Sequence, residues 1–306
     1  MPKVFRFSAY GGPDVQELVE LPMPSPGPSE LLVKVKSAGV NPVDCKLRSG
    51  ALAQSMPRDL PAEFGSEVSG VVEEVGQDVE GFAVGDEVFG SPAPTHGGFS
   101  EYTVLTATAT AKKPTHVSFD DAATLTVAAA TAYDAVTQLG LAEGQTLLIN
   151  GVGGGVGVAA AQIARDFGIA VIGTASEGKR PLVEMLGATL VPSGDGVEQR
   201  VRELMPDGVD GILDLVGGAA LSAVAPLAKV PAKIVSAADP MTVSQLGGAP
   251  VQRDGTAVVL NKVASMVADG KFDPHVSDVV TFDDVAQAIA SVEGGHAVGK
   301  VVVKVS

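Results

Sequence analysis

The spacing of hydrophobic positions changes along the chain and divides it into stretches of different predicted structure. In the first third, short apolar runs are separated by Gly, Pro and Asp, a pattern typical of irregular β structure. Strands are predicted at residues 4–10, 31–40, 68–76, 86–90 and 99–105. Residues 120–140 are instead rich in Ala and Leu and begin with acids, which suit the positive end of a helix dipole, so a helix is predicted there.

From residue 146 onward, predicted strands and helices alternate. Strands are expected at 146–150, 170–176, 211–217 and 232–238, and helices at 156–168, 179–188, 197–205 and 220–228. Repeated strand–helix units predict a parallel sheet with helices on both faces. Two more helices, at 258–271 and 283–295, precede a last strand at 299–305. The predicted fold class is therefore α/β, with a β-rich domain beside a doubly wound parallel sheet.

The length of the chain agrees with this organisation, and its net charge argues against two classes of binding partner. The chain has 306 residues, which is about two domains at roughly 150 residues per domain. Its 36 acidic and 21 basic residues give a formal charge of −15, which repels phosphate backbones and anionic membranes in the absence of a segregated basic patch. We therefore expect no nucleic-acid or membrane partner.

One uncharged stretch, residues 144–164, has the length of a membrane span. Its glycines, Asn150 and two glutamines favour a strand, a glycine turn and a buried helix instead. The first residues lack the apolar core of a secretory signal, so a cytoplasmic location is the default expectation. Cys45 is the one cysteine and the four histidines show no ligand spacing, so neither an intrachain disulfide nor a four-cysteine zinc site is possible.

A glycine-rich run follows the strand at 146–150 and opens the next helix. The residues expected to bind a cofactor there are Gly153, Gly154, Gly155 and Val156, with Gly157 behind them. A strict G-x-G-x-x-G is absent, but the run still offers a tight turn, a surface without side chains and a helix start, which together suit a dinucleotide pyrophosphate. The alternative is a glycine turn that only packs, and no Walker-type Gly-Lys-Ser follows.

The end of the second strand in such a fold distinguishes the two nicotinamide cofactors. A carboxylate there binds the ribose hydroxyls of NADH, whereas cations accept the 2′-phosphate of NADPH. Here Ala175 and Ser176 stand at the acid position, and Lys179 and Arg180 follow. These residues predict NADPH as the cofactor. Two alternatives stay open: the cations form a solvated pair at a helix start, or Glu177 points at the ribose.

Seven short motifs, in this order, carry a family resemblance over essentially the whole chain. They are AGVNPVD (38–44), GSEVSG (65–70), VGDEV (84–88), GGFSEY (97–102), TAY (131–133), GGVG (154–157) and GK (299–300). The chain resembles the zinc-free quinone oxidoreductase branch of the medium-chain dehydrogenase/reductase superfamily. The resemblance implies a GroES-like catalytic domain at residues 1–120, a Rossmann NADPH-binding domain at 121–257, and a return to the catalytic domain at 258–306.

In zinc-dependent relatives a Cys, a His and a second Cys bind the catalytic metal. The matching positions here are Asn41, Ser66 and Val127, with Glu67 as the one carboxylate beside them. An amide, a hydroxyl and a valine are poor zinc donors, so the resemblance implies no metal. The four-cysteine structural lobe of those relatives is also missing from the chain.

Without a Lewis acid, a carbonyl acceptor must be activated by hydrogen bonds. Quinones and α,β-unsaturated carbonyls suit this regime because conjugation spreads the developing negative charge. Asn41 is the first candidate donor to the substrate oxygen, although Asn before Pro42 is also common in turns. Asp44 either orients neighbouring groups or bonds local backbone, and Lys46 either attracts an oxyanion or is a plain surface cation.

The resemblance implies further cofactor contacts. These fall on Asn41, Pro42, Thr131, Leu215, Val216, Ser236, Ala237 and Ala238. Several quinone reductases of the branch have tyrosines where this chain has Lys46, Leu52 and Ser193, and residues 41–46 look closer to the enone and alkenal reductases. Reduction of an enone therefore competes with reduction of a quinone. A non-catalytic NADPH-binding redox sensor or structural protein is the alternative function, and by resemblance we expect a homo-oligomer, such as a homodimer.

Overall fold

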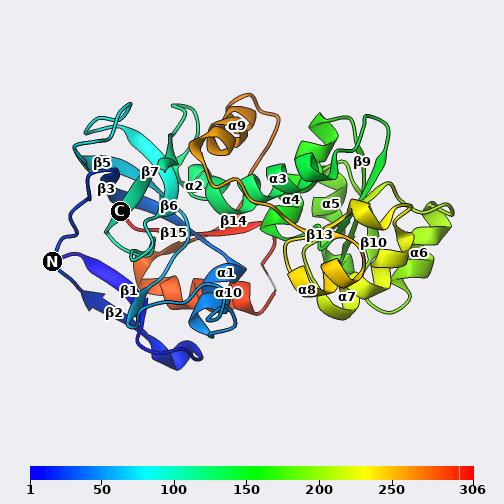
Figure 1. Cartoon of the computed structure of the whole chain (residues 1–306), viewed down its shortest axis with the longest axis horizontal. Helices are drawn as coiled ribbons and strands as arrows, with labels where there is room; N and C mark the ends of the chain where they lie inside the picture. The colour runs from blue at the N-terminus through cyan, green and yellow to red at the C-terminus, as the bar shows by residue number, and fades with distance from the viewer. Residues whose placement is uncertain (296) are drawn as a thin grey trace. The chain divides into compact units, whose positions relative to one another are not determined.

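The computed structural model describes residues 1–295 and 297–306, which form two compact units (Figure 1). Unit 1 comprises residues 1–127, 255–268 and 276–306, and unit 2 comprises residues 128–254 and 269–275. Within the described residues, no helix combines the length and the apolar character needed to cross a bilayer. The uncharged stretch 144–164 forms a strand, a glycine turn and a helix, as expected from its composition.

Unit 1 is built on a curved antiparallel sheet. Four of its strands are β3 (Glu30–Val40), β5 (Val68–Val75), β6 (Glu87–Pro92) and β7 (Tyr102–Lys112). They pair in a ring, because β3 bonds to both β5 and β7. A ring of this kind leaves fewer open edges than a flat sheet. The apolar side chains of the ring pack inward around Leu31, Val33 and Phe99.

The two ends of the chain complete unit 1. At the C-terminus, β15 (Lys300–Lys304) pairs antiparallel with β3 and parallel with β14 (Val276–Thr281). At the N-terminus, a small sheet contains β1 (Lys3–Phe7), β2 (Gln16–Glu20) and β4 (Ala62–Glu63). The helices of unit 1 are α1 (Pro42–Arg48), α2 (Phe119–Ala122), α9 (Ala257–Ala268) and α10 (Val285–Glu293). This is the predicted GroES-like, β-rich architecture.

Unit 2 contains a six-stranded parallel sheet. In spatial order the strands are β10 (Thr189–Pro192), β9 (Ala170–Ala175), β8 (Thr146–Asn150), β11 (Gly211–Asp214), β12 (Ile234–Ser236) and β13 (Ala249–Pro250). Numbered within this sheet, the order is 3-2-1-4-5-6, that of the Rossmann fold. Leu147, Leu148 and Ile149 are all fully buried, although successive side chains point to opposite faces of a strand. Both faces of the sheet are therefore covered, as predicted.

Six helices accompany this sheet. They are α3 (Ala130–Leu139), α4 (Gly155–Asp166), α5 (Arg180–Met185), α6 (Val197–Leu204), α7 (Gly218–Val224) and α8 (Pro240–Gln245). The single helix predicted at 120–140 is wrong in one respect: it is broken into α2, a π-helical turn at Leu125–Ala129, and α3. In that turn the Val127 N–H donates to the Glu67 carboxylate at 2.7 Å. A side chain inserted into the helical ladder in this way is a usual cause of a π-helical turn.

Candidate active site and cofactor site

The first candidate site begins where β3 ends and α1 starts. Asn41 is the N-cap of α1, and Pro42 follows at the first helical position, where its missing N–H costs nothing. The Asn41 backbone N–H donates to Asp44 Oδ2 at 2.9 Å, which is one half of a capping box. The capping pattern therefore brings the candidates Asn41 and Asp44 together, both buried.

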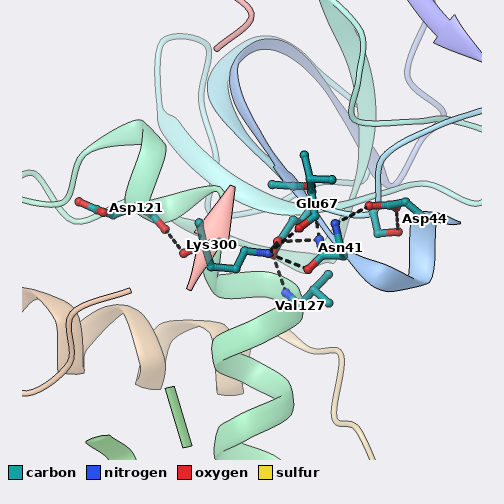
Figure 2. Close-up of polar contacts among 10 residues, drawn as sticks. Asn41, Asp44, Glu67, Asp121, Val127 and Lys300 are labelled. Carbon is teal, nitrogen blue, oxygen red and sulfur yellow. Dashed lines mark hydrogen bonds and ion pairs between the residues drawn. The ribbon is translucent and has the colours of Figure 1, made fainter. Parts of the chain in front are cut away.

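A buried ion pair lies beside Asn41 (Figure 2). Lys300 Nζ donates to Glu67 Oε1 at 2.8 Å, to Asn41 Oδ1 at 2.7 Å and to the Val40 carbonyl at 3.2 Å. The exposed fraction is 4% for the Lys300 side chain and 0% for that of Glu67. All three ammonium hydrogens therefore have acceptors, which is the condition for burying a lysine in its charged form.

Glu67 is held from several sides. Its Oε1 also accepts from Asn41 Nδ2 at 2.8 Å, and its Oε2 accepts from the Val127 N–H. A Cβ on Gly39 would lie 2.3 Å from Glu67 Oε1 and 2.5 Å from the Ala123 carbonyl. Gly39 is therefore required for the close approach of the carboxylate, independently of any unusual backbone angle.

The amide of Asn41 is oriented by these neighbours. Its Oδ1 accepts from Lys300, while its Nδ2 donates to Glu67 and, at the longer distance of 3.3 Å, to the Gly39 carbonyl. Because lysine only donates, it fixes which end of the amide faces it. Both amide hydrogens thus have acceptors within the protein, and the bond to Gly39 is the weaker of the two by length.

Asp44 is a third titratable group of this cluster, beside Lys300 and Glu67. Its Oδ1 accepts from the Ser66 hydroxyl at 2.6 Å. Burial raises the pKa of Asp44 to about 7, against the lowering effect of the hydrogen bonds from Ser66 and Asn41. The carboxyl group therefore changes its protonation near neutral pH.

The other candidates in α1 lie differently. Lys46 and Pro42 are exposed and outside the buried cluster. Arg48 is buried, forms an ion pair with Glu293 of α10, and donates to the Gly11 carbonyl at 3.1 Å. Burial also raises the pKa of the Cys45 thiol to about 12, as is typical of a buried, unreactive cysteine.

The second candidate site is the glycine turn of unit 2. Gly151 has φ of +96°, in the region that favours glycine, and a Cβ on Gly157 would lie 2.6 Å from the Gly151 carbonyl and from Val152 Cα. These glycines let α4 start close to the end of β8. At Gly154, by contrast, a Cβ would meet only one atom within 4 Å, and no side chain caps the helix there. At Gly154 the turn therefore has a surface without side chains, and the helix start lacks a side-chain cap, a combination that fits a pyrophosphate.

A buried polar network ties the carboxyl ends of four strands together. Asn150 Nδ2 donates to Asp214 Oδ1 at 2.8 Å, the Ser236 hydroxyl donates to Asp214 Oδ2 at 2.6 Å, and the Thr174 hydroxyl donates to Asn150 Oδ1 at 2.6 Å. Asp214 also accepts from the N–H groups of Val216 and Gly217. Ligands of this fold bind at the carboxyl ends of the strands, so the network shapes the loops on which a cofactor would rest.

The candidate cofactor residues of unit 2 gather at that edge. Gly153–Val156, Ser176–Arg180, Leu215–Val216 and Ser236–Ala238 each lie at or just after the end of a parallel strand, and Thr131 is buried in the first turn of α3. Lys179 Nζ donates to the Gly153 carbonyl at 3.2 Å. Arg180 instead pairs with Glu177 and Glu184, and Ser176 is exposed.

Sequence reasoning did not give Lys300 a role. It entered only as part of a family motif, although one signal was present: a lysine directly before the apolar run 301–303 starts a buried strand. Antiparallel register pairs Val301 with Val40, which places Lys300 next to Asn41. Asn150 and Asp214 were likewise missed, although each is the polar last residue of a buried strand, β8 or β11.

Comparisons with known proteins agree with both units. Residues 27–115 match the family model described as alcohol dehydrogenase GroES-like domain, and residues 186–303 match the one described as zinc-binding dehydrogenase. The chain is 33% identical over 319 residues to a 2-methylene-furan-3-one reductase of Solanum lycopersicum, covering 98% of this chain and 78% of the tomato protein.

Solved structures agree as well. The quinone oxidoreductase of Coxiella burnetii superposes with a TM-score of 0.91 at 29% identity, covering 100% of this chain and 99% of the other. The mycobacterial protein Rv1454c, solved in complex with NADPH, gives a TM-score of 0.87 at 28% identity and covers 100% of both chains. The chain therefore belongs to the quinone oxidoreductase and enone reductase branch of the medium-chain dehydrogenase/reductase superfamily, and it is an oxidoreductase that uses a nicotinamide cofactor on a small molecule.

Proposed function

We propose that this chain transfers a hydride from NADPH to a quinone or an α,β-unsaturated carbonyl compound without a metal. The observation that carries the proposal is the Lys300–Glu67–Asn41 cluster, which puts a buried ammonium group beside the residues that match metal ligands in relatives. The tomato reductase and the Coxiella enzyme, named for an enone and for quinones, support the two acceptor classes.

Zinc does not fit the residues of this site. Val127 has no donor atom in its side chain, and the oxygens of Glu67 already accept from Lys300, Asn41 and Val127. No group of three His, Cys, Asp or Glu side chains with metal-binding geometry occurs among the described residues. An ammonium group at the centre of the cluster also repels a divalent cation. We therefore propose that the reaction is zinc-independent.

We further propose residues 1–120 and 258–306 as the catalytic domain and 121–257 as the NADPH-binding domain, on the change of sequence pattern near residue 120 and the return of β15 to unit 1. A cytoplasmic location and a homodimer are proposed from the resemblance alone. In the NADPH-binding domain, the proposed contacts are the residues at the strand ends, with Lys179 and Arg180 toward the 2′-phosphate. The reduced nicotinamide, when bound, supplies the hydride.

The residues of α1 have separate proposed roles. Asn41 donates one amide hydrogen to the acceptor oxygen, which replaces the Gly39 carbonyl at the end of the longer, 3.3 Å bond. Lys300 and Glu67 keep the amide in this orientation. Asp44 positions Ser66 and the first turn of α1, and exposed Lys46 attracts the negative charge that develops on the acceptor. The last proton comes from water.

The proposal is tested by turnover with purified protein. We expect oxidation of NADPH, followed at 340 nm, with 1,4-benzoquinone or with a simple enone such as 3-penten-2-one. Metal analysis of protein purified without added metal is expected to find no stoichiometric zinc, and EDTA is expected to leave the rate unchanged. Tight binding of NADPH with no turnover of any acceptor would indicate a non-catalytic sensor instead, and stoichiometric zinc would contradict the metal-free mechanism.

Asn41→Ala is expected to lower kcat roughly 10- to 100-fold, because one hydrogen bond to a charged oxygen contributes about 1.5–3 kcal/mol. The KM for NADPH is expected to change little. Steady-state kinetics corrected for the folded fraction, measured by circular dichroism, separate this effect from loss of stability. An unchanged kcat would show that the Asn41 amide serves only to donate to Glu67 and to accept from Lys300 within the protein.

A further inference from the structure

The two neighbouring cations after β9, Lys179 and Arg180, have different surroundings. Lys179 lies along the glycine turn: its Nζ donates to the Gly153 carbonyl, and its Cδ is so close that a Cβ on Gly153 would lie 2.3 Å from it. Burial lowers the pKa of Lys179. Arg180 is turned away from the glycine turn toward acidic side chains of its own segment.

All three guanidinium nitrogens of Arg180 are engaged by carboxylates. Nε and Nη2 donate to the two oxygens of Glu177 at 2.5 and 2.9 Å, a bidentate arrangement, and Nη1 donates to Glu184 at 3.3 Å. These hydrogen bonds raise the pKa of Arg180 and lower that of Glu177. Arg180 therefore keeps its positive charge, but its hydrogen-bonding nitrogens are already bound to carboxylates.

We propose that Glu177 sets the preference between NADPH and NADH by competing with the 2′-phosphate for Arg180. This inference rests on the proposed cofactor site at the strand ends of unit 2. A 2′-phosphate must either displace the Glu177 carboxylate from Arg180 or share the guanidinium with it. Either arrangement weakens the binding of NADPH, because two anions then face one cation, whereas NADH has no phosphate at that position.

The preference for NADPH over NADH is therefore smaller than it would be if no carboxylate were paired with Arg180. Lys179 and Arg180 together favour the phosphorylated cofactor, and Glu177 reduces that advantage without binding NADH itself. The bidentate contact singles out Glu177 over Glu184, which touches Arg180 through the longer bond alone. The same substitution at Glu177 and at Glu184 therefore compares a bidentate with a single contact to Arg180.

The experiment measures dissociation constants of NADPH and NADH by isothermal titration calorimetry. Glu177→Gln is expected to tighten NADPH roughly 3- to 10-fold and to change NADH less than about twofold, a range set by the modest strength of exposed ion pairs. Glu184→Gln is the matched control, with an expected change below about twofold for both cofactors. The gain in Glu177→Gln should shrink as the salt concentration rises.

A double variant separates competition from a general change of charge. Combined with Arg180→Met, Glu177→Gln is expected to lose most of its gain for NADPH, because the cation that it frees is gone. Weaker NADH binding with unchanged NADPH binding in Glu177→Gln would overturn the inference and show that Glu177 binds the ribose hydroxyls. Equal effects of the two glutamates would overturn it too. If neither nucleotide binds the unaltered protein, the proposed function itself fails.

Discussion

Replacing Lys300 with Met is expected to lower the free energy of unfolding by about 3–5 kcal/mol, the usual cost of leaving one member of a buried ion pair alone. The substitution leaves the Glu67 carboxylate buried at 0% exposure without its cation. It also removes the donor that orients the Asn41 amide, so kcat is expected to fall as well. Urea unfolding followed by circular dichroism measures the loss, since the chain has no Trp for fluorescence.

Two comparisons make this prediction specific. Lys300→Met combined with Glu67→Gln is expected to recover much of the stability, because the buried charge is then removed rather than unpaired. Lys112→Met is the control on the surface: Lys112 pairs with Asp86 at 2.8 Å but is 55% exposed, so its loss is expected to change stability by less than about 1 kcal/mol. Similar losses for Lys300→Met and Lys112→Met would contradict the importance of the buried pair.

Asp44 is expected to make the protein less stable as the pH rises from about 4 to neutrality. The pKa of Asp44 is about 7 in the folded chain against the ordinary 3.8 of an aspartate, so the native state binds the proton more tightly than the unfolded state. The resulting stabilisation of the native state is fully present below the pKa of Asp44 in the unfolded chain. It is lost as the pH rises through the pKa of Asp44 in the folded chain. Asp44→Asn removes this dependence, so its stability relative to the unaltered protein is expected to rise by about 2–4 kcal/mol between pH 5 and pH 8.

Unfolding in urea at a series of pH values measures this difference. Asp86→Asn is a matched control, because hydrogen bonding to Lys112 lowers the pKa of Asp86 and its titration lies below this pH range. Its stability relative to the unaltered protein is expected to stay constant from pH 5 to pH 8. A constant difference for Asp44→Asn over the same range would mean that Asp44 stays ionised throughout.

Much of the fold followed from local patterns. The strand–helix alternation of unit 2 was predictable because buried parallel strands are continuous apolar runs, as at Leu147–Ile149. Helix α1 was missed because Asn41-Pro42 was considered only as a substrate contact or a turn, although the same two residues are also a usual start of a helix. Strand β14 was missed because it lies at a sheet edge and its side chains are mostly exposed, which leaves no clear alternation.

The candidate site was predictable only where its residues are close in sequence. Asn41 and Asp44 are joined by a capping box, and the glycine turn is one continuous run. Lys300 and Asn41 are 259 positions apart and meet through the register of β15 on β3. No local pattern encodes that pairing. The pairing of Arg180 with Glu177 and Glu184 could not be predicted either. A sequence shows that acidic and basic residues are near one another, but not which of them form ion pairs.

The distance in sequence between Glu67 and Lys300 has a consequence for biosynthesis. Lys300 follows Glu67 by 233 positions, so the cation that neutralises Glu67 is made long after it, as is the strand β15 that pairs with β3. Most of unit 2, residues 128–254, is one continuous stretch that is made before Lys300 and can fold without it. A nascent chain that extends past residue 254 but has not yet reached Lys300 therefore contains every strand of the Rossmann sheet, while Glu67 still lacks its cation and β3 lacks the strand β15.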